Sequence, residues 1–347
     1  MIELKQGDIL QADAQALVNT VNCVGFMGRG IALQFKNAFP ENFQQYRAVC
    51  QRKELQPGKM LIHDLHRLHN PRFVINFPTK RHWKGKSRIE DIEAGLDTLI
   101  KEIRIRHITS IAVPPLGCGL GGLNWNEVRP KIIKAFQELP DVQVLLFEPK
   151  GAPAPEEMVH QKSIPAMTVG RASLLSLMQR YLAAVMDPFV SLLEIHKLMY
   201  FMQEAGEPLN LRYDKGTYGP YAKNLRHVLN LMEGHFISGF GDAGDNPEKQ
   251  IELLPGSAEK ADDFLREHAQ TRTRFDRVVQ LIEGFETPFG MELLATVHWV
   301  KTREDAQTLD QATAQTYAWN NRKRMFQEKH IRIAWETLEK QGWFLNS

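Results

Sequence analysis

The feature that most constrains the fold is a change of hydrophobic pattern part-way along the chain. Before about residue 150, short β-type runs alternate with amphipathic stretches, and after about residue 168 apolar residues recur at helical spacing. Alternating strands and helices are typical of an α/β sandwich, whereas helical spacing alone is typical of a helical domain. At 347 residues, the chain is also longer than one hydrophobic core usually fills. The sequence therefore predicts a three-layer α/β domain followed by a mostly α-helical domain.

The elements predicted in the first half are short apolar runs and the amphipathic stretches between them. Strands mostly buried on both faces are predicted at residues 16–21, 59–63, 73–77, 108–113 and 142–147. Helices are predicted between them at residues 30–39, 41–53, 88–106 and 125–139. In the second half, helices are predicted at residues 173–182, 192–205, 274–285, 290–301 and 322–340. Proline and small residues predict a linker at 153–167, between domains 1–152 and 168–347.

Composition excludes several classes of protein. The chain is 43% hydrophobic and 24% charged, as folded globular proteins are. It has no apolar run of 18 residues and no secretion signal, so we expect a cytoplasmic protein with no membrane partner. Three cysteines without a CxxC pair fit a reducing compartment rather than a disulfide scaffold. His196 and His298 have no partner at ligand spacing, so no metal site is expected.

The formal net charge of +2 hides two halves of opposite sign. Residues 1–164 carry 22 Lys and Arg against 17 Asp and Glu, a net charge of +5. Residues 165–347 carry 21 against 24, a net charge of −3, and within them residues 242–310 hold 15 acids and 8 bases. An excess of this size is usually a solvated surface, so it identifies no partner by itself.

Two glycine-rich segments each lie between a predicted strand and a predicted helix, at residues 19–30 and residues 114–122. Their amides and the helix N-termini behind them favour an anion, so two such loops at neighbouring strand ends predict a diphosphate site. A third glycine segment, residues 7–9, follows the opening strand. One such loop alone would more often be turn chemistry. Neither the P-loop nor the Rossmann spacing occurs.

Four short motifs carry a resemblance to a known family. The Gly-Asp-Ile of residues 7–9, the Val-Asn-Thr-Val-Asn of residues 18–22 and the glycine run of residues 117–122 resemble a macrodomain, the ADP-ribose-binding module, over roughly residues 1–150. Residues 76–83, Asn-Phe-Pro-Thr-Lys-Arg-His-Trp, resemble more narrowly the DarG-type DNA ADP-ribosyl glycohydrolases. These antitoxins are paired with DarT toxins, which ADP-ribosylate bases in single-stranded DNA. The segment is also similar to the eukaryotic terminal ADP-ribose protein glycohydrolase, which shares its lysine.

The resemblance implies both a fold and an activity. The fold is a macrodomain with a mixed sheet between helices, and the activity is hydrolysis of the N-glycosidic bond between ADP-ribose and a DNA base, with thymidine the expected base. That reaction needs no metal or redox cofactor, and ADP-ribose is its product and ligand. Three alternatives stay open here: a glycohydrolase of protein or acyl-linked ADP-ribose, a non-catalytic reader of ADP-ribose, and an antitoxin that only sequesters its toxin.

The resemblance also implies which residues hold ADP-ribose. Asp8 accepts from the adenine amino group beside the Ile9 amide, and Asn22 bonds the distal ribose. The alternatives are a turn cap for Asp8 and a buried amide that stabilises its own loop for Asn22. The remaining expected contacts are Thr20, Gly28, Gly30, Ile31, Thr79, Gly117, Cys118, Gly119, Leu120, Gly121 and Gly122.

Lys80 is the expected catalytic residue. It follows a buried strand and Pro78, so it should project from the end of that strand into the site. Partial desolvation and neighbouring cations lower the pKa of a lysine and make it competent as a nucleophile or as an acid. Its role stays open, because the eukaryotic relative has an aspartate in the last loop where this chain has Gly121. The alternative is a solvated basic face, with His82 a bystander.

The segment around Lys80 is also the expected DNA contact. Its cations, together with one tryptophan, have the composition used to bind single strands, by phosphate contacts and by stacking. The alternative is a basic loop around a packed tryptophan. The expected DNA-binding residues are Arg81, Trp83, Lys84 and Lys86.

In the second half, residues 192–206 and 217–221 resemble the helical antitoxin domains called Panacea or SocA-like. The resemblance implies that this half binds the cognate DarT-type toxin. The acidic stretch 242–310 is compatible with a DNA-like surface that the toxin would bind. The Met and aromatic stripe at residues 199–202 is more often core than interface.

Overall fold

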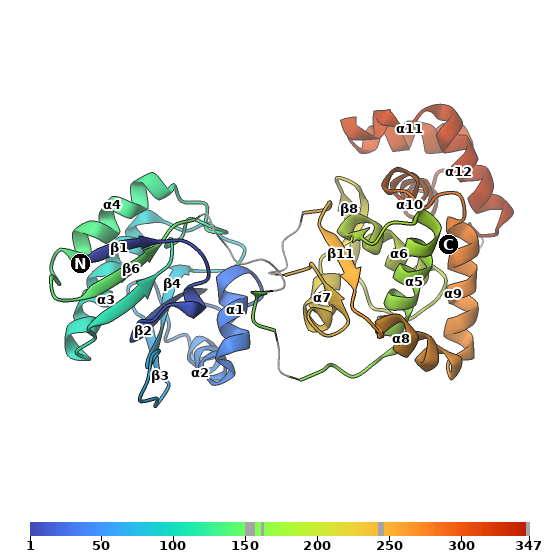
Figure 1. The fold of residues 1–347 in the computed structure, drawn as a ribbon. Coiled ribbons are helices and arrows are strands. Elements are labelled where there is room, and N and C mark those ends of the chain that lie inside the picture. Colours follow the sequence, from blue (N-terminus) through green and yellow to red (C-terminus); the bar gives the residue numbers. More distant parts are fainter. Residues whose placement is uncertain (150–156, 161–162, 242–245, 345–347) are drawn as a thin grey trace. The chain divides into compact units, whose positions relative to one another are not determined.

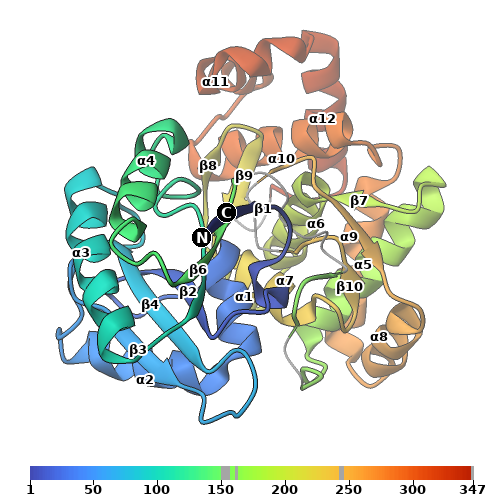
Figure 2. The ribbon, with the colours of Figure 1, turned by 60° about the vertical axis from the view of Figure 1, so that its left-hand side comes forward.

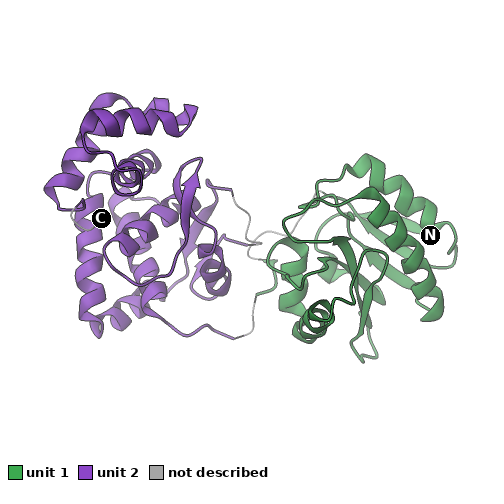
Figure 3. Ribbon diagram, turned by 180° about the vertical axis from the view of Figure 1, so that it is seen from behind, with its two compact units in different colours: residues 1–162, 242–244 green, residues 163–241, 245–347 purple. Residues whose placement is uncertain are grey.

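The computed structural model describes residues 1–149, 157–160, 163–241 and 246–344. The chain forms two compact units, and Figure 3 colours them separately. The first unit holds the described residues up to 160, and the second holds those from 163 onward. The predicted linker, 153–167, lies partly outside the described residues, so its boundaries remain a prediction.

A six-stranded sheet forms the centre of the first unit (Figure 1). Its strand order is β1-β6-β5-β2-β4-β3, and all neighbours are parallel except β3, which runs antiparallel to β4. The strands are β1 (Ile2–Lys5), β2 (Ala16–Asn22), β3 (Leu61–Asp64), β4 (Phe73–Lys80), β5 (Ser110–Val113) and β6 (Gln143–Phe147). The mixed sheet that was expected is therefore confirmed.

Helices cover both faces of this sheet. They are α1 (Gly30–Ala38), α2 (Pro40–Gln51), α3 (Ile89–Ile105) and α4 (Trp125–Phe136), with a short 3-10 turn, η1 (Ile9–Gln11). Neighbouring strand residues point to opposite faces, so Val18 packs with Leu96 of α3 and Ile132 of α4, whereas Leu17 packs with Phe35 of α1. The three-layer arrangement is confirmed, and Figure 1 shows α3 and α4 on one side of the sheet.

Two strands differ from expectation. The run at 59–63 was predicted to be mostly buried on both faces, but β3 is the antiparallel edge strand of the described sheet and is only half-buried, because it has a strand neighbour on one side only among the described residues. The strand predicted at 73–77 continues as β4 through Pro78 to Lys80. Pro78 is tolerated there because it lies at the end of the strand, where few ladder hydrogen bonds remain.

The second unit is mostly helical. Its helices are α5 (Val169–Val185), α6 (Leu192–Glu204), α7 (Leu225–Met232), α8 (Ser257–Arg266), α9 (Ala269–Ile282), α10 (Pro288–Arg303), α11 (Leu309–Trp319), η3 (Asn321–Met325) and α12 (Glu328–Lys340). The helices predicted from spacing are present, except that the helix predicted at 322–340 is divided into the 3-10 turn η3 and α12. Helices α7, α8 and α11 were not predicted. Short strands also occur: β7 (Val190–Ser191), β10 (Ile237–Ser238) and β11 (Gln250–Leu253) form one sheet, and β8 (Tyr213–Gly216) pairs with β9 (Gly219–Ala222).

Helices α6 and α10 form the core of this unit. Both are buried along most of their length, and α10 also packs against α12 (Figure 2). Residues 199–202 of α6 are buried, as expected for core residues. The histidines are core residues too: His298 contacts the hydroxyl of Tyr200 at 2.8 Å, and Ala222 N donates to His196 Nδ1 at 3.3 Å.

A group of buried charges lies inside the same core. Lys323 Nζ donates to Glu292 Oε1 at 2.7 Å, and Arg322 contacts the other oxygen of Glu292 at 3.2 Å. Lys197 is fully buried and donates to the carbonyl oxygen of Pro220 at 2.6 Å. Burial and the charge of Lys323 lower the pKa of Lys197 to about 7.

Two kinds of feature are absent from the described part of the chain. No helix there is long and apolar enough to cross a membrane. No group of three or more His, Cys, Asp or Glu side chains there could hold a metal ion.

Candidate active site

The carboxyl ends of β2, β4 and β5 meet at one edge of the sheet, because these strands are parallel neighbours. The two glycine-rich loops follow β2 and β5, and Lys80 ends β4. A shift of register at Val21 and Asn22 places Asn22 opposite Lys80. The fold therefore places the two predicted loops and the predicted catalytic residue together, where α/β folds bind ligands.

Asn22 holds the loop that follows β2. Its Oδ1 accepts from the amide of Val24 at 3.0 Å, and its Nδ2 donates to the carbonyl oxygen of Phe26 at 2.6 Å. The hydroxyl of Tyr46 donates to the carbonyl oxygen of Asn22 at 2.7 Å. The loop-stabilising role considered for Asn22 is thus present, and its contact with the distal ribose stays a prediction.

Three fully buried asparagines lie beneath this loop, and the sequence reasoning did not single them out. Asn76 in β4 accepts from Asn19 in β2 at 3.0 Å and donates to Asn42 in α2 at 2.6 Å. Asn19 also contacts the sulfur of Met27 in the loop at 3.8 Å. These bonds fix β2, β4 and α2 to one another below the site. The sequence did contain a signal for two of them. Asparagine is depleted in strands, and Asn19 and Asn76 each interrupt an apolar run that was predicted to be a strand.

The loop that follows β5 is packed too tightly for side chains at two positions. At Gly117, with φ +70°, a Cβ would lie 2.9 Å from Leu123 Cδ1. At Gly121 it would lie 2.2 Å from the carbonyl oxygen of Gly117 and 2.3 Å from Ser87 Oγ. The amide of Ser87 also donates to the carbonyl oxygen of Gly121 at 3.0 Å. Glycine at 121 is therefore required by this loop, which has no room for the aspartate that the eukaryotic relative carries there.

Lys80 is bonded to the loop that follows β5. Its Nζ donates to the carbonyl oxygen of Leu120, and Leu120 Cδ1 lies 3.8 Å from where a Cβ on Gly30 would be. Partial burial lowers the pKa of Lys80 from its usual value, because it removes water from the charged amine. The fold thus brings Lys80, Leu120 and the first residue of α1 to the same place.

The other predicted ligand contacts lie along the same edge. Asp8 caps η1 and accepts from the amide of Leu10 at 2.9 Å, which is the turn-capping role considered for it. Thr79 is buried beside the carbonyl oxygen of Val21, and burial raises the pKa of the Cys118 thiol to about 11. The rest are placed as follows: Ile9 is buried, Thr20, Gly28 and Ile31 are half-buried, and Gly119 and Gly122 are exposed.

The basic segment after Lys80 divides into two parts. Arg81 binds both oxygens of Asp91 in α3, at 3.0 and 3.2 Å, whereas Lys84 and Lys86 are exposed. Lys84 Nζ lies 5.1 Å from the centre of the Trp83 ring. Arg81 is therefore already paired, and its role in binding DNA stays a prediction.

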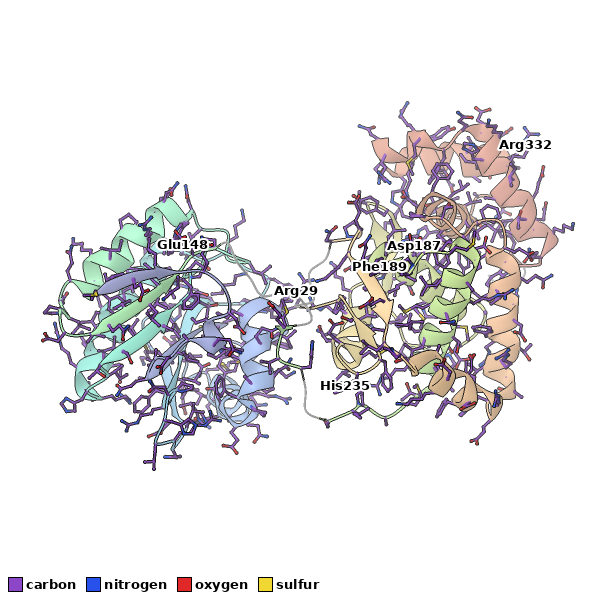
Figure 4. The ribbon with its side chains drawn as sticks, in the orientation of Figure 1. Arg29, Glu148, Asp187, Phe189, His235 and Arg332 are labelled. Carbon is purple, nitrogen blue, oxygen red and sulfur yellow. The ribbon has the colours of Figure 1, made fainter. Side chains whose placement is uncertain are left out.

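Phe26 and Trp83 form an exposed aromatic pair, and Trp83 follows Lys80 by three residues. Their ring centres are 6.2 Å apart, and they are 60% and 40% exposed. Phe26 comes from the loop held by Asn22, just ahead of Arg29 and α1 (Figure 4). Sequence reasoning missed Phe26, although an aromatic residue inside a glycine loop was a signal for exposure.

The Macro domain family model matches residues 18–132. The DNA ADP-ribosyl glycohydrolase of Thermus aquaticus is 43% identical over 342 residues, which covers 99% of this chain and 94% of that protein. The chain belongs to the DNA ADP-ribosyl glycohydrolase family. It is thus a member of a hydrolase family, and the predicted resemblance and fold class are confirmed.

Two further relatives extend the comparison. The DNA ADP-ribosyl transferase-DNA ADP-ribosyl glycohydrolase fusion protein of Thermosipho africanus is 34% identical over 176 residues, covering 46% of this chain and 45% of that protein. The solved macrodomain of Mycobacterium tuberculosis DarG is 52% identical. The match covers 43% of the chain described here and 99% of the solved macrodomain, with a TM-score of 0.43.

Proposed function

We propose that the chain hydrolyses the N-glycosidic bond that joins ADP-ribose to a base of single-stranded DNA, thymidine being the expected base. The observation that carries the proposal is the position of Lys80 at the end of β4, bonded to Leu120 of the glycine loop. The Lys80 amine, whose pKa is lowered by partial burial, lies at the edge of the sheet where the two glycine-rich loops begin. Membership of the glycohydrolase family supports the same activity.

The diphosphate of ADP-ribose would bind between the two loops. Helix α1 begins at Gly30, and within the described structure no side chain caps its first amides. Uncapped amides at a helix N-terminus are suited to an anion. Leu120 of the opposite loop approaches Gly30, so a diphosphate there would be held from both sides. The distal ribose would then lie at Lys80.

Lys80 would act as a cationic proton donor to the leaving base. When the C1″–N bond breaks, negative charge develops on the base, and the Lys80 ammonium can donate its proton to it. Water adds to C1″ and gives up a proton to the neutral Lys80 amine, so that the C1″–N bond is replaced by a C1″–O bond and free ADP-ribose and the unmodified base are the products. A lysyl intermediate is less well supported, because the acid that would resolve it has no room at Gly121. In the free protein, Leu120 O accepts the hydrogen bond that the base would take.

The modified base would stack on Phe26 and Trp83. Both rings are exposed, Trp83 follows Lys80 by three residues in the chain, and exposed lysines at 84 and 86 come next. Stacking on aromatic side chains and phosphate contacts are how single strands are bound. A cytoplasmic site of action suits a DNA substrate and three free cysteines.

The test compares two substrates in the full chain. Release of ADP-ribose is measured from an oligonucleotide with one modified thymidine and from a peptide with a modified glutamate. We expect turnover on the oligonucleotide and its loss in Lys80→Ala, with Lys59→Ala as a matched exposed control. Turnover on the peptide alone would establish the acyl activity instead. Binding of ADP-ribose without any turnover, unchanged in Lys80→Ala, would establish a reader.

A second function is proposed for residues 168–347, which would bind the cognate DarT-type toxin. The relative from Thermus aquaticus matches this chain through both units, and the Thermosipho africanus protein joins a transferase and a glycohydrolase in one chain, as its name states. The full chain with Lys80→Ala should still prevent the toxin from modifying an oligonucleotide when both are mixed at equal concentration. Unrestrained modification in that mixture would contradict this role.

A further inference from the structure

A cavity of about 370 Å³ opens beside the proposed active site, and the activity proposed above does not use it. Two of its residues, Cys23 and Arg81, directly follow Asn22 and Lys80 at the strand ends. The other lining residues come from the segment after α2 and from the start of α3. They are Leu55, Gln56, Pro57, Asp91 and Ala94.

The walls of this cavity are held by hydrogen bonds. Thr98 Oγ1 of α3 donates to the carbonyl oxygen of Gly58 at 2.7 Å, and the amide of Lys59 donates to the carbonyl oxygen of Gln56 at 2.9 Å. On the other side, Arg81 binds Asp91 through two hydrogen bonds. A cavity fixed in this way is available without rearrangement, and its volume is in the ~300–1,000 Å³ range of small-molecule pockets.

The lining fits an uncharged aromatic ring with polar edges. Leu55, Pro57 and Ala94 supply apolar surface, and Gln56 supplies an amide that can bond a base edge. Arg81 binds Asp91 through its Nε and one terminal nitrogen, which leaves further guanidinium N–H donors for the same edge. Asp91 offsets the charge of Arg81, so the cavity has little net attraction for a phosphate. Single-stranded bases are bound in this way, with apolar contact to the ring and hydrogen bonds to the edge.

The cavity and the reacting lysine lie on different sides of the end of β4. Lys80 reaches Leu120 of the glycine loop, whereas Arg81 reaches Asp91 of α3. Lys80 and Arg81 are consecutive residues, so their Cα atoms are about 3.8 Å apart. We propose that the cavity binds the nucleobase next to the modified nucleotide, so that the substrate is recognised as at least a dinucleotide. This inference rests on the proposed DNA glycohydrolase function.

The experiment measures discrimination between neighbouring nucleotides in the full chain. Oligonucleotides carry one ADP-ribosylated thymidine and either ordinary neighbours or an abasic site on its 5′ or its 3′ side. We expect kcat/KM to fall about tenfold when the base is missing on one of the two sides, as stacking energies imply. Ala94→Phe fills the cavity. In this variant, kcat/KM for the oligonucleotide with the neighbouring base should be about the same as kcat/KM for the abasic one, so that their ratio falls to about 1.

Two further variants make the test specific. Lys101→Phe places the same ring on an exposed position two turns along α3 and should keep the tenfold ratio. Gln56→Ala removes an exposed amide without filling space and should lower the ratio about threefold. Cleavage of modified DNA with a wild-type ratio near 1 on both sides, or an unchanged ratio in Ala94→Phe, would overturn the inference alone. Cleavage of no oligonucleotide would remove the proposed function, and this inference with it.

Discussion

Lys80 at the end of β4 donates a hydrogen bond from its Nζ to the carbonyl oxygen of Leu120 in the glycine loop. The bond joins two segments that are 40 residues apart and arise from non-adjacent strands of the sheet. A substrate group that accepts the same proton would take the place of the Leu120 carbonyl oxygen. Binding and proton donation are thus linked through one amine.

The pH dependence of catalysis tests the state of Lys80. Desolvation lowers its pKa below the usual 10.5. Because the proposed role needs the ammonium form, kcat/KM should fall as the pH rises through this lowered pKa. Lys80→Arg should retain part of the activity with a flat profile over that range, since arginine stays charged. Borohydride added during turnover should trap no adduct. A trapped lysyl adduct, or a rate that rises with pH, would identify a nucleophile.

Replacement of Gly121 tests the packing of the loop. In Gly121→Ala the new Cβ would lie 2.2 Å from Gly117 O, so the loop must shift at a cost of about 1–3 kcal/mol. We expect a lower unfolding temperature for the first unit and weaker binding of ADP-ribose in calorimetry. A Cβ built on Gly119 would have no other described atom within 4 Å, so Gly119→Ala should change the unfolding temperature little. Equal melting of both variants would contradict this account.

Loss of the aromatic pair should weaken DNA binding selectively. Stacking contributes about 1–3 kcal/mol per base. Phe26→Ala or Trp83→Ala should therefore lower affinity for a modified oligonucleotide about tenfold, measured with Lys80→Ala present to prevent turnover. Affinity for free ADP-ribose should change less than about twofold. Phe189, labelled in Figure 4, is a similarly exposed phenylalanine of the second unit, and Phe189→Ala should leave both affinities unchanged.

Lys197 predicts how the stability of the second unit depends on pH. Its pKa is about 7 in the folded chain, because of burial and then the charge of Lys323, and about 10.4 when unfolded. Between these values the unfolded state binds the extra proton, so the free energy of unfolding rises with pH, by up to about 1.4 kcal/mol per unit. The destabilisation that comes from burying the charged Lys197 is complete below pH 7 and vanishes above about pH 10.4.

Lys197→Met removes this titration. The variant should show a shallower rise of unfolding free energy between pH 7.5 and 9.5 than the wild type does, measured with urea and tryptophan fluorescence. Four of the six tryptophans belong to the second unit, so fluorescence reports mainly on it. Lys340→Met removes an exposed lysine and should keep the wild-type slope. The same slope in all three proteins would show that Lys197 titrates normally.

The sequence predicted the strand-helix alternation and the two loops well, because hydrophobic period and glycine placement are local properties. It did not predict that β3 is an edge strand, since strand order depends on contacts between distant segments. Helices α7 and α8 were missed despite their amphipathic patterns, as they are short and lie among glycines and polar residues.

The candidate site was predictable in its backbone and less so in its side chains. The loop glycines and the lysine at the strand end could each be predicted from a single local segment of the sequence. By contrast, the pairing of Arg81 with Asp91 and the meeting of Phe26 with Trp83 join different elements, and only the fold brings them together. Asn22 shows the same limit, because its bonds depend on how its own loop turns back.

The crowding at Gly121 bears on how such enzymes can change during evolution. A Cβ there meets the backbone of Gly117 as well as Ser87, so an aspartate cannot be gained by one substitution while the loop keeps its shape. A lineage with an acid at this point and a lineage with glycine are therefore separated by a rebuilt loop.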